Sequence, residues 1–145
     1  IMNVYEKLTI NTDGGSRGNP GHSAIGVYIS ANEEKVAEIS EYIGITTNNV
    51  AEYTAVIKAL EYLVDQKIQS PQIDFILDSE LVVKQIRGLY KIKQPHLQDL
   101  NSKIKNLIKQ LYANSQIKEI NFNHVLREKN KQADALVNSC LDSQN

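Results

Sequence analysis

The 145-residue sequence has one cysteine and no tryptophan. The single cysteine, Cys140, excludes an intrachain disulfide and a zinc site built from several thiolates, and it fits a reducing compartment. No apolar run approaches the about 18 residues that cross a membrane. The first residues also lack the basic and then apolar pattern of a signal peptide. We therefore expect a cytoplasmic protein without a membrane segment.

The sequence also lacks an excess of charge of either sign. Sixteen Lys and Arg face 17 Asp and Glu, giving a net charge of -1. This excludes a strongly basic domain, so any contact with nucleic-acid phosphates must come from a local patch. Hydrophobic residues make up 41% and charged residues 23% of the chain, which is ordinary globular composition. Length and composition together predict one domain over residues 1–145.

Three strands are predicted at the start of the chain, where apolar and polar residues alternate. The first covers residues 8–12 and enters a glycine-rich stretch at Asp13, which we interpret as a loop. The second and third cover residues 24–30 and 35–43, separated by a short polar turn. These three strands are expected to form an antiparallel meander.

The rest of the chain alternates between helical and strand patterns. Helices are predicted over residues 50–66, 79–87 and 130–141 and from near Pro95, and strands over 72–77 and 119–125. The order βββ-α-β-α-α-β-α predicts an α/β protein with a five-stranded mixed sheet. Its three-strand antiparallel meander is joined by parallel strands, and helices flank both faces.

Four acidic residues stand at the ends of predicted elements. Asp13 and Asp78 each follow a strand, and the carboxyl ends of parallel strands share one crevice. Taken singly, each acid has a simpler interpretation. Either Asp could merely support a turn, Glu52 could form a capping box with Asn49, and Asp134 lies in a first helical turn, where the helix dipole favours a carboxylate.

If these four acids meet in one pocket, they repel one another unless they are protonated or bridged by cations. The chain offers no set of thiolates and only three scattered histidines, so oxygen ligands favour Mg²⁺ or Mn²⁺ over Zn²⁺. Two such ions ~4 Å apart could activate water and stabilise the leaving oxygen of a phosphodiester.

Four sequence blocks resemble, in order, the motifs of the type one ribonuclease H family, and the resemblance covers nearly the whole chain. The blocks are TDGGSRGNPG at 12–21, TNNVAEY at 47–53, DSE at 78–80 and NKQAD at 130–134. The resemblance implies the ribonuclease H fold and hydrolysis of the RNA strand of an RNA–DNA hybrid, leaving 3′-hydroxyl and 5′-phosphate ends. It implies that the catalytic and metal-ligating residues are Asp13, Glu52, Asp78 and Asp134, holding two ions, with Glu52 also near the 2′-hydroxyl of the RNA strand.

The resemblance further implies that four residues line the minor groove of the hybrid, where they could test for 2′-hydroxyls. These residues are Gly14, Asn19, Asn48 and Asn49. Adjacent Asn residues also suit a helix N-cap, and Asn19 could be a turn residue only.

The sequence departs from the family in the loop before the last helix, where many members carry a flexible His. Residues 126–130 contain none. Arg127 is our first candidate for this helper position, because a guanidinium could bind a phosphate although it cannot act as a general base. Glu128 could pair with it. His124 precedes the loop and is the second candidate, with a structural role in the strand as the alternative.

A basic helical insertion that grips the hybrid in many members also looks absent. Four basic residues could form a reduced phosphate patch or an ordinary solvated face: Lys84, Arg87, Lys91 and Lys93. We expect a monomer without an obligate protein partner. The alternative functions are a catalytically silent nucleic-acid-binding domain, a ribonuclease H domain of a reverse transcriptase or transposon polyprotein, and a related exonuclease or integrase.

Overall fold

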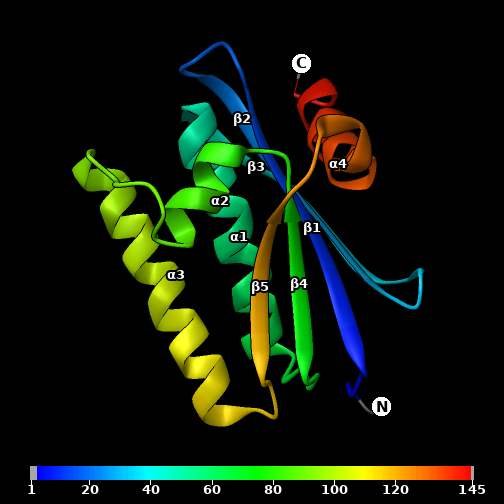
Figure 1. Ribbon diagram of the computed structural model, residues 1–145. Helices are drawn as coiled ribbons and strands as arrows, with labels where there is room; N and C mark the ends of the chain where they lie inside the picture. Colours follow the sequence, from blue (N-terminus) through cyan, green and yellow to red (C-terminus); the bar gives the residue numbers. More distant parts are fainter. Residues whose placement is uncertain (1–2, 145) are drawn as a thin grey trace.

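A five-stranded sheet in the order β3-β2-β1-β4-β5 lies at the centre of the computed structural model, which describes residues 3–144 (Figure 1). The chain enters the sheet with β1 (Lys7–Arg17), β2 (Gly21–Ala31) and β3 (Glu34–Thr46). β1 pairs antiparallel with β2, and β2 pairs antiparallel with β3. The predicted meander is therefore confirmed, with strands longer than predicted.

The glycine-rich stretch after Asp13 continues β1, so its interpretation as a loop was wrong. Gly14 pairs with Ile25 and Gly15 with Ala24 in the antiparallel ladder, and the turn is confined to residues 18–20. Gly18 has a φ of +92°, a conformation that glycine adopts without strain. Glycine is accepted within this central strand because a helix packs directly on its backbone, which leaves no room for a side chain.

Two parallel strands extend the sheet on the other side of β1. β4 (Gln72–Leu77) has the predicted bounds, and β5 (Glu119–His124) ends one residue earlier than predicted. β4 pairs parallel with β1, with Asn11 opposite Ile76. Asp13 and Asp78 each lie two residues beyond this pair, so the register places both at the same edge of the sheet.

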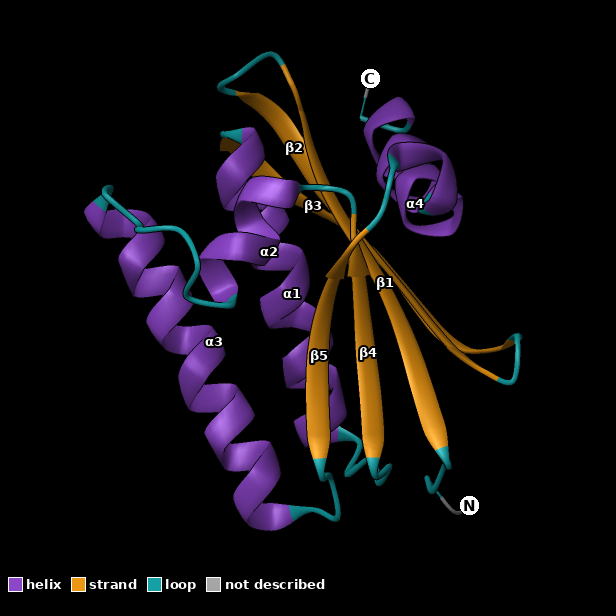
Figure 2. Ribbon diagram, in the orientation of Figure 1, coloured by secondary structure: helices purple, strands orange, loops and turns teal. Residues whose placement is uncertain are grey.

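Helices cover both faces of the sheet, as predicted (Figure 2). They are α1 (Asn48–Asp65), α2 (Glu80–Ile86), α3 (Pro95–Asn114) and α4 (Lys131–Asp142), with a 3₁₀ turn, η1 (Arg127–Lys129), before α4. α1, α2 and α3 cover one face of the sheet, and the main core fills the space between this face and the three helices. On the opposite face α4 packs alone, over a smaller cluster of Ala24, Val137 and Leu141.

Within residues 3–144, no helix combines the length and apolar character that a membrane span requires.

Two glycines allow helices to lie against the central strands from opposite sides. A Cβ on Gly14 would lie 2.2 Å from the carbonyl carbon of Ala51 in α1. A Cβ on Gly26 in β2 would lie 2.4 Å from the carbonyl oxygen of Ala133 in α4. Both distances are shorter than any carbon contact allows, so these positions accept only glycine unless the helices move. The close approach brings the first turns of α1 and α4 to the place where the pairing of β1 with β4 ends.

The helix N-termini differ in part from the predicted caps. The Thr47 hydroxyl accepts the N–H of Val50 at 3.3 Å, so α1 begins two residues earlier than predicted. Glu52 does not form the alternative capping box, because its side chain turns to β1 instead. Ser79 caps α2, because its hydroxyl accepts the N–H of Val82 at 3.3 Å.

Candidate active site

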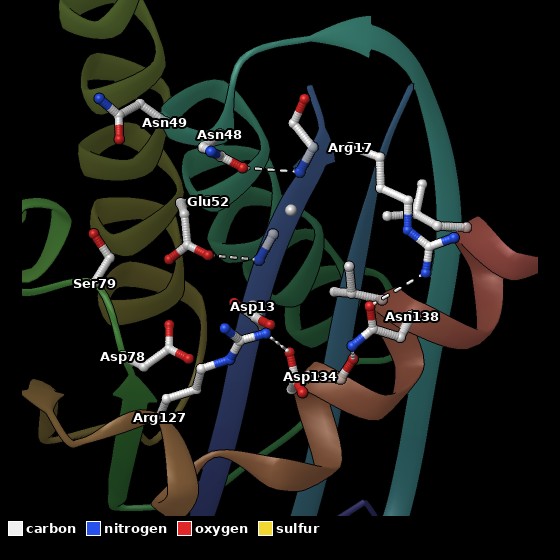
Figure 3. Close-up of a pocket in the computed structure, with 15 residues that line it drawn as sticks. Asp13, Arg17, Asn48, Asn49, Glu52, Asp78, Ser79, Arg127, Asp134 and Asn138 are labelled. Carbon is white, nitrogen blue, oxygen red and sulfur yellow. Dashed lines mark hydrogen bonds and ion pairs between the residues drawn. The ribbon is translucent and has the colours of Figure 1, made fainter. Parts of the chain in front are cut away.

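An open pocket of about 450 Å³ lies where β1 and β4 meet the first turns of α1 and α4. All four predicted carboxylates line it, together with Arg127 (Figure 3). They come from separate parts of the chain. Asp13 lies in β1, Glu52 in α1 and Asp134 in α4, and Asp78 is the residue directly after β4. The sheet and its flanking helices thus assemble the acidic pocket.

Three of the four carboxylates form a tight cluster. One oxygen each from Asp13, Glu52 and Asp78 lies within 4.8 Å of the other two. Asp13 and Glu52 are 7% and 6% exposed, and Asp78 is half-buried. The convergence expected for these acids is therefore observed for three of them, at a spacing that one cation could bridge.

Glu52 has one fixed and one unpartnered carboxylate oxygen. Its Oε1 accepts a hydrogen bond from the backbone N–H of Gly14 at 2.7 Å. Its Oε2 is buried and has no hydrogen-bond partner among residues 3–144. A buried carboxylate oxygen without a partner is strongly unfavourable. The three acids therefore fit a cation, which would supply the missing partner.

Burial and mutual repulsion disfavour the ionised forms of these acids. Burial raises the pKa of Asp13 to about 7, and the charges of Asp78 and Asp134 add to this effect. Burial, and then the contact with Asp13, raise the pKa of Glu52 well above its usual value. Burial also raises the pKa of Asp78, although the Arg127 charge opposes the rise. A divalent metal ion would stabilise the ionised cluster, and an all-oxygen ligand set suits such an ion.

Asp134 stands apart from the three-acid cluster, at the rim of the same pocket. It lies in the first turn of α4, as predicted, and its Oδ1 is 3.3 Å from Nη2 of Arg127. The Arg127 side chain is 75% exposed, so this pair is accessible to solvent. Pairing of Arg127 with Glu128 was expected as a possibility, but Asp134 takes this place because η1 turns the guanidinium over the start of α4.

His124 is the last residue of β5. It is exposed and is not among the residues that line the pocket. Of the two helper candidates, the structure therefore brings only Arg127 to the acids.

Three of the four predicted substrate-binding residues lie beside the acids. Gly14, Asn48 and Asn49 line the pocket. The Asn48 side-chain oxygen accepts the N–H of Ser16 at 2.8 Å, and the backbone N–H of Asn48 donates to Oδ1 of Asn19 at 3.0 Å. Asn19 therefore does not line the pocket and instead fixes the start of α1 to the turn after β1.

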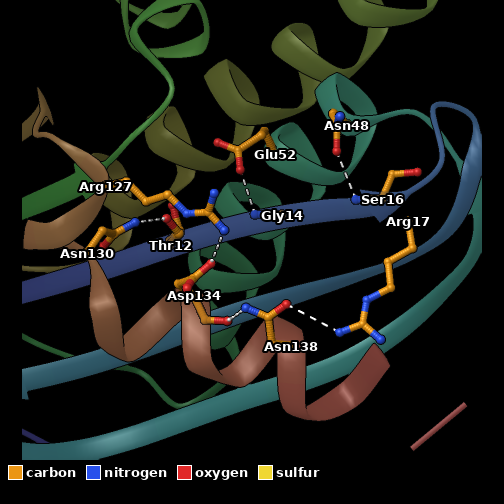
Figure 4. A network of polar contacts seen from close by, with 10 residues as sticks. All are labelled: Thr12, Gly14, Ser16, Arg17, Asn48, Glu52, Arg127, Asn130, Asp134 and Asn138. Carbon is orange, nitrogen blue, oxygen red and sulfur yellow. Dashed lines mark hydrogen bonds and ion pairs between the residues drawn. The ribbon is translucent and has the colours of Figure 1, made fainter. Parts of the chain in front are cut away.

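Further polar residues at this site were missed from the sequence (Figure 4). Asn138 donates to the carbonyl oxygen of Asp134 at 3.1 Å, and Arg17 forms an ion pair with Asp142 at 2.6 Å. Asn130 is fully buried and donates to the carbonyl oxygen of Thr12 at 2.9 Å. The four-residue spacing of Asn138 from Asp134 was a usable signal for a shared helix face.

The basic residues proposed as a reduced phosphate patch are partly engaged with their own helix. Lys84 forms an ion pair with Glu80 at 3.0 Å and lies 5.0 Å from the centroid of the Tyr90 ring. Lys84 is thus paired with an acidic residue of its own helix.

Comparison with known proteins agrees with this geometry. The family model described as "Reverse transcriptase-like" matches residues 11–140. The chain is 39% identical over 131 residues to ribonuclease HI of Halobacterium salinarum, covering 90% of this chain and 62% of that protein. It is 38% identical over 139 residues to a bifunctional protein of Mycobacterium tuberculosis, covering 94% of this chain and 36% of that protein. The chain thus spans less than two thirds of either relative.

Solved structures of similar sequence share the whole fold. LC11-RNase H1, solved in complex with an RNA/DNA hybrid, is 43% identical with a TM-score of 0.85, over 93% of this chain and 96% of that chain. The N-terminal ribonuclease H domain of the Mycobacterium tuberculosis protein is 36% identical with a TM-score of 0.83, over 94% and 99%. The Halobacterium salinarum RNase H1 gives the same identity and score, over 94% and 98%. Because it shares this fold and 36–43% sequence identity with these ribonuclease H structures along nearly its whole length, the chain belongs to the ribonuclease H family, type 1.

Proposed function

We propose that this chain is a metal-dependent endoribonuclease that hydrolyses the RNA strand of RNA–DNA hybrids, leaving 3′-hydroxyl and 5′-phosphate ends. The observation that carries the proposal is the three-acid cluster of Asp13, Glu52 and Asp78, with Asp134 at the rim of the same pocket. The similarity to LC11-RNase H1, whose structure contains an RNA/DNA hybrid, supports the choice of substrate.

The four acids are the proposed ligands of two divalent ions, Mg²⁺ or Mn²⁺. The all-oxygen ligand set and the unpartnered Oε2 of Glu52 support this assignment. When bound, such ions would supply the positive charge that a phosphodiester needs at its attacking and leaving oxygens.

The residues of the chain would hold the substrate and the acids in place. The N–H of Gly14 fixes one oxygen of Glu52, which leaves the other oxygen for the pocket. Arg127, exposed beside Asp134, would contact a phosphate of the substrate or the product as a permanent cation. It would not move a proton, because its guanidinium stays protonated at neutral pH.

Asn48 and Asn49, with Gly14, would contact the minor groove of the hybrid. The side-chain oxygen of Asn48 is already used by the N–H of Ser16. The free group of this amide is therefore its NH₂, which can donate to a ribose 2′-hydroxyl or to a base acceptor in the groove. Such contacts would distinguish RNA from DNA without reading the sequence of bases.

A cleavage assay with end-labelled substrates tests the proposal. The wild type should cut the RNA of a hybrid in Mg²⁺ or Mn²⁺, and should leave double-stranded DNA intact. Asp13→Asn should lose at least about a thousandfold in rate, because it removes a carboxylate from the cluster. Asp74→Asn is the matched control, since Asp74 lies in β4 outside the pocket lining. Equal cleavage by wild type and Asp13→Asn, or no cleavage by either, would overturn the proposal.

We further propose a single domain over residues 1–145, acting as a cytoplasmic monomer without an obligate protein partner. A catalytically silent binding domain is less well supported, because all four acids line the pocket. A ribonuclease H domain within a longer polyprotein would use the same chemistry. The coding sequence on either side of this chain would distinguish it.

A further inference from the structure

Asn130 occupies the N-cap position of α4, but its side chain does not cap the helix. An Asn at this position ordinarily accepts an N–H from the first turn of its own helix. Here the side chain points to β1 instead (Figure 4). Its Nδ2 donates to the carbonyl oxygen of Thr12 at 2.9 Å, and its Oδ1 accepts from Nδ2 of Asn11 at 3.0 Å. The donor and the acceptor of this fully buried side-chain amide are thus both hydrogen-bonded to β1.

These bonds connect the elements that carry two of the acids, Asp13 in β1 and Asp134 in α4. Thr12 directly precedes Asp13, and the carbonyl oxygen of Asn130 accepts the N–H of Asp134 at 3.2 Å. Asn130 is therefore bonded to β1 through its side chain and to the first turn of α4 through its backbone carbonyl.

We propose that Asn130 is a positioning residue for the acidic pocket, which fixes Asp134 relative to Asp13 by joining the first turn of α4 to β1. The inference rests on the proposed function, because it concerns the same metal-dependent site. An amide suits the task, since it presents a donor and an acceptor side by side. Asp, Ser and Ala each lack one of these groups or place it elsewhere.

The rest of α4 is held to the sheet by other contacts, which lie further along the helix. The Ser40 hydroxyl donates to the carbonyl oxygen of Leu136 at 2.7 Å, and Val137 and Leu141 pack on Ala24. Loss of the Asn130 side chain would therefore leave α4 docked while its first turn, with Asp134, became less constrained. The predicted defect is one of position, separate from loss of the fold.

Two variants and one control test the proposal. Asn130→Ala removes both side-chain bonds, and Asn11→Ala removes only the bond to Oδ1 of Asn130. Asn121→Ala is the control, because this amide in β5 donates to Asp74 at 2.9 Å, outside the pocket lining. The first measurement is the rise in melting temperature during titration with Mn²⁺ or Mg²⁺, without substrate. The second is steady-state cleavage of a hybrid, with kcat and KM determined separately.

Asn130→Ala should need at least about tenfold more metal for half of the maximal rise in melting temperature. Its kcat should fall by at least about tenfold, while KM for the hybrid stays within about twofold, because the substrate-contacting residues are untouched. Asn11→Ala should show a smaller change in the same direction. Asn121→Ala should lower the melting temperature without changing the metal requirement.

A metal requirement of Asn130→Ala within about twofold of wild type, with only a lower melting temperature, would overturn the proposal and assign the residue a purely structural role. If Asn130→Ala does not fold, Asn11→Ala decides by the same criterion. A wild type that neither responds to metal nor cuts the hybrid would overturn the proposed function and this inference together. A normal wild type with unaffected variants would overturn the inference alone.

Discussion

Oε1 of Glu52 accepts a hydrogen bond from the backbone N–H of Gly14, with 2.7 Å between the oxygen and the nitrogen. This bond crosses from α1 to β1 and is possible because Gly14 has no side chain. The hydrogen bond that fixes Glu52 in the pocket thus depends on Gly14, the residue directly after Asp13.

Gly14→Ala should destabilise the protein and impair the site together. The new Cβ would lie 2.2 Å from a backbone atom of Ala51, so α1 must move away from β1. We expect the free energy of unfolding, measured with urea, to fall by about 3 kcal/mol. Cleavage of a hybrid should fall as Glu52 loses its bond. Gly15→Ala is the matched control, because its Cβ would meet only a side-chain carbon of Val137 at 3.2 Å. Similar losses in both variants would contradict the explanation.

The metal-free protein should lose stability as the pH rises from 5 to about 7. Burial raises the pKa of Asp13 from 3.8 to about 7, so in this range the folded protein holds a proton that the unfolded chain has released. Stability therefore falls with pH until the folded pKa is passed. Melting temperatures in a chelator should show this fall, and saturating Mg²⁺ should remove it by stabilising the ionised acids. A flat profile in the chelator would argue against the raised pKa.

Asp13→Asn should be more stable than wild type without metal at pH 8, although it should be inactive. The substitution removes repulsion between carboxylate oxygens that lie within 4.8 Å of one another, which is worth about 1 kcal/mol or more. Asp74→Asn should behave oppositely and lose about 1 kcal/mol, because Asp74 pairs with Lys7 at 3.1 Å and accepts from Asn121. Chemical denaturation in a chelator measures both. Destabilisation by Asp13→Asn would show that its carboxylate has a favourable partner in the metal-free protein.

Arg127→Ala should slow cleavage and also tighten metal binding. The guanidinium lies 3.3 Å from Asp134, so its removal leaves a more negative pocket for cations while a phosphate contact is lost. We expect kcat to fall by about tenfold and the metal requirement for thermal stabilisation to decrease. His124→Ala should change neither by more than about twofold, because His124 is outside the pocket lining. A larger effect of His124→Ala on kcat would make His124 the helper residue.

Periodicity and strand order were sufficient to predict most of the fold. The apolar pattern gave β4 with its observed bounds, and Pro95 marked the start of α3. The predicted end of β1 at residue 12 was wrong, because glycine and serine residues such as those after Asp13 ordinarily indicate a turn. Their use within a strand depends on the close approach of Ala51, which is a tertiary contact.

The acids of the site were predictable, but their individual partners were not. Strand ends bring Asp13 and Asp78 to one edge for any mixed sheet of this order. The pairing of Arg127 with Asp134 depends on the turn of η1, and the bond between Asn11 and Asn130 joins residues that are 119 positions apart. Local sequence rules assign Asn130 to a helix cap, and only the packed structure shows that its amide serves β1 instead.

The position of α4, alone on its face of the sheet, also determines when the pocket becomes complete during synthesis. The sheet and the main core, built with α1 and α3, contain no residue of α4. A growing chain folds from its N-terminal part first, so this core can form before residues 131–142 pack on the sheet. Asp134 reaches the pocket only when α4 packs on the sheet. The nuclease we propose would therefore gain its full set of acids as a late step of its own folding, and an incompletely translated chain would not cut nucleic acid.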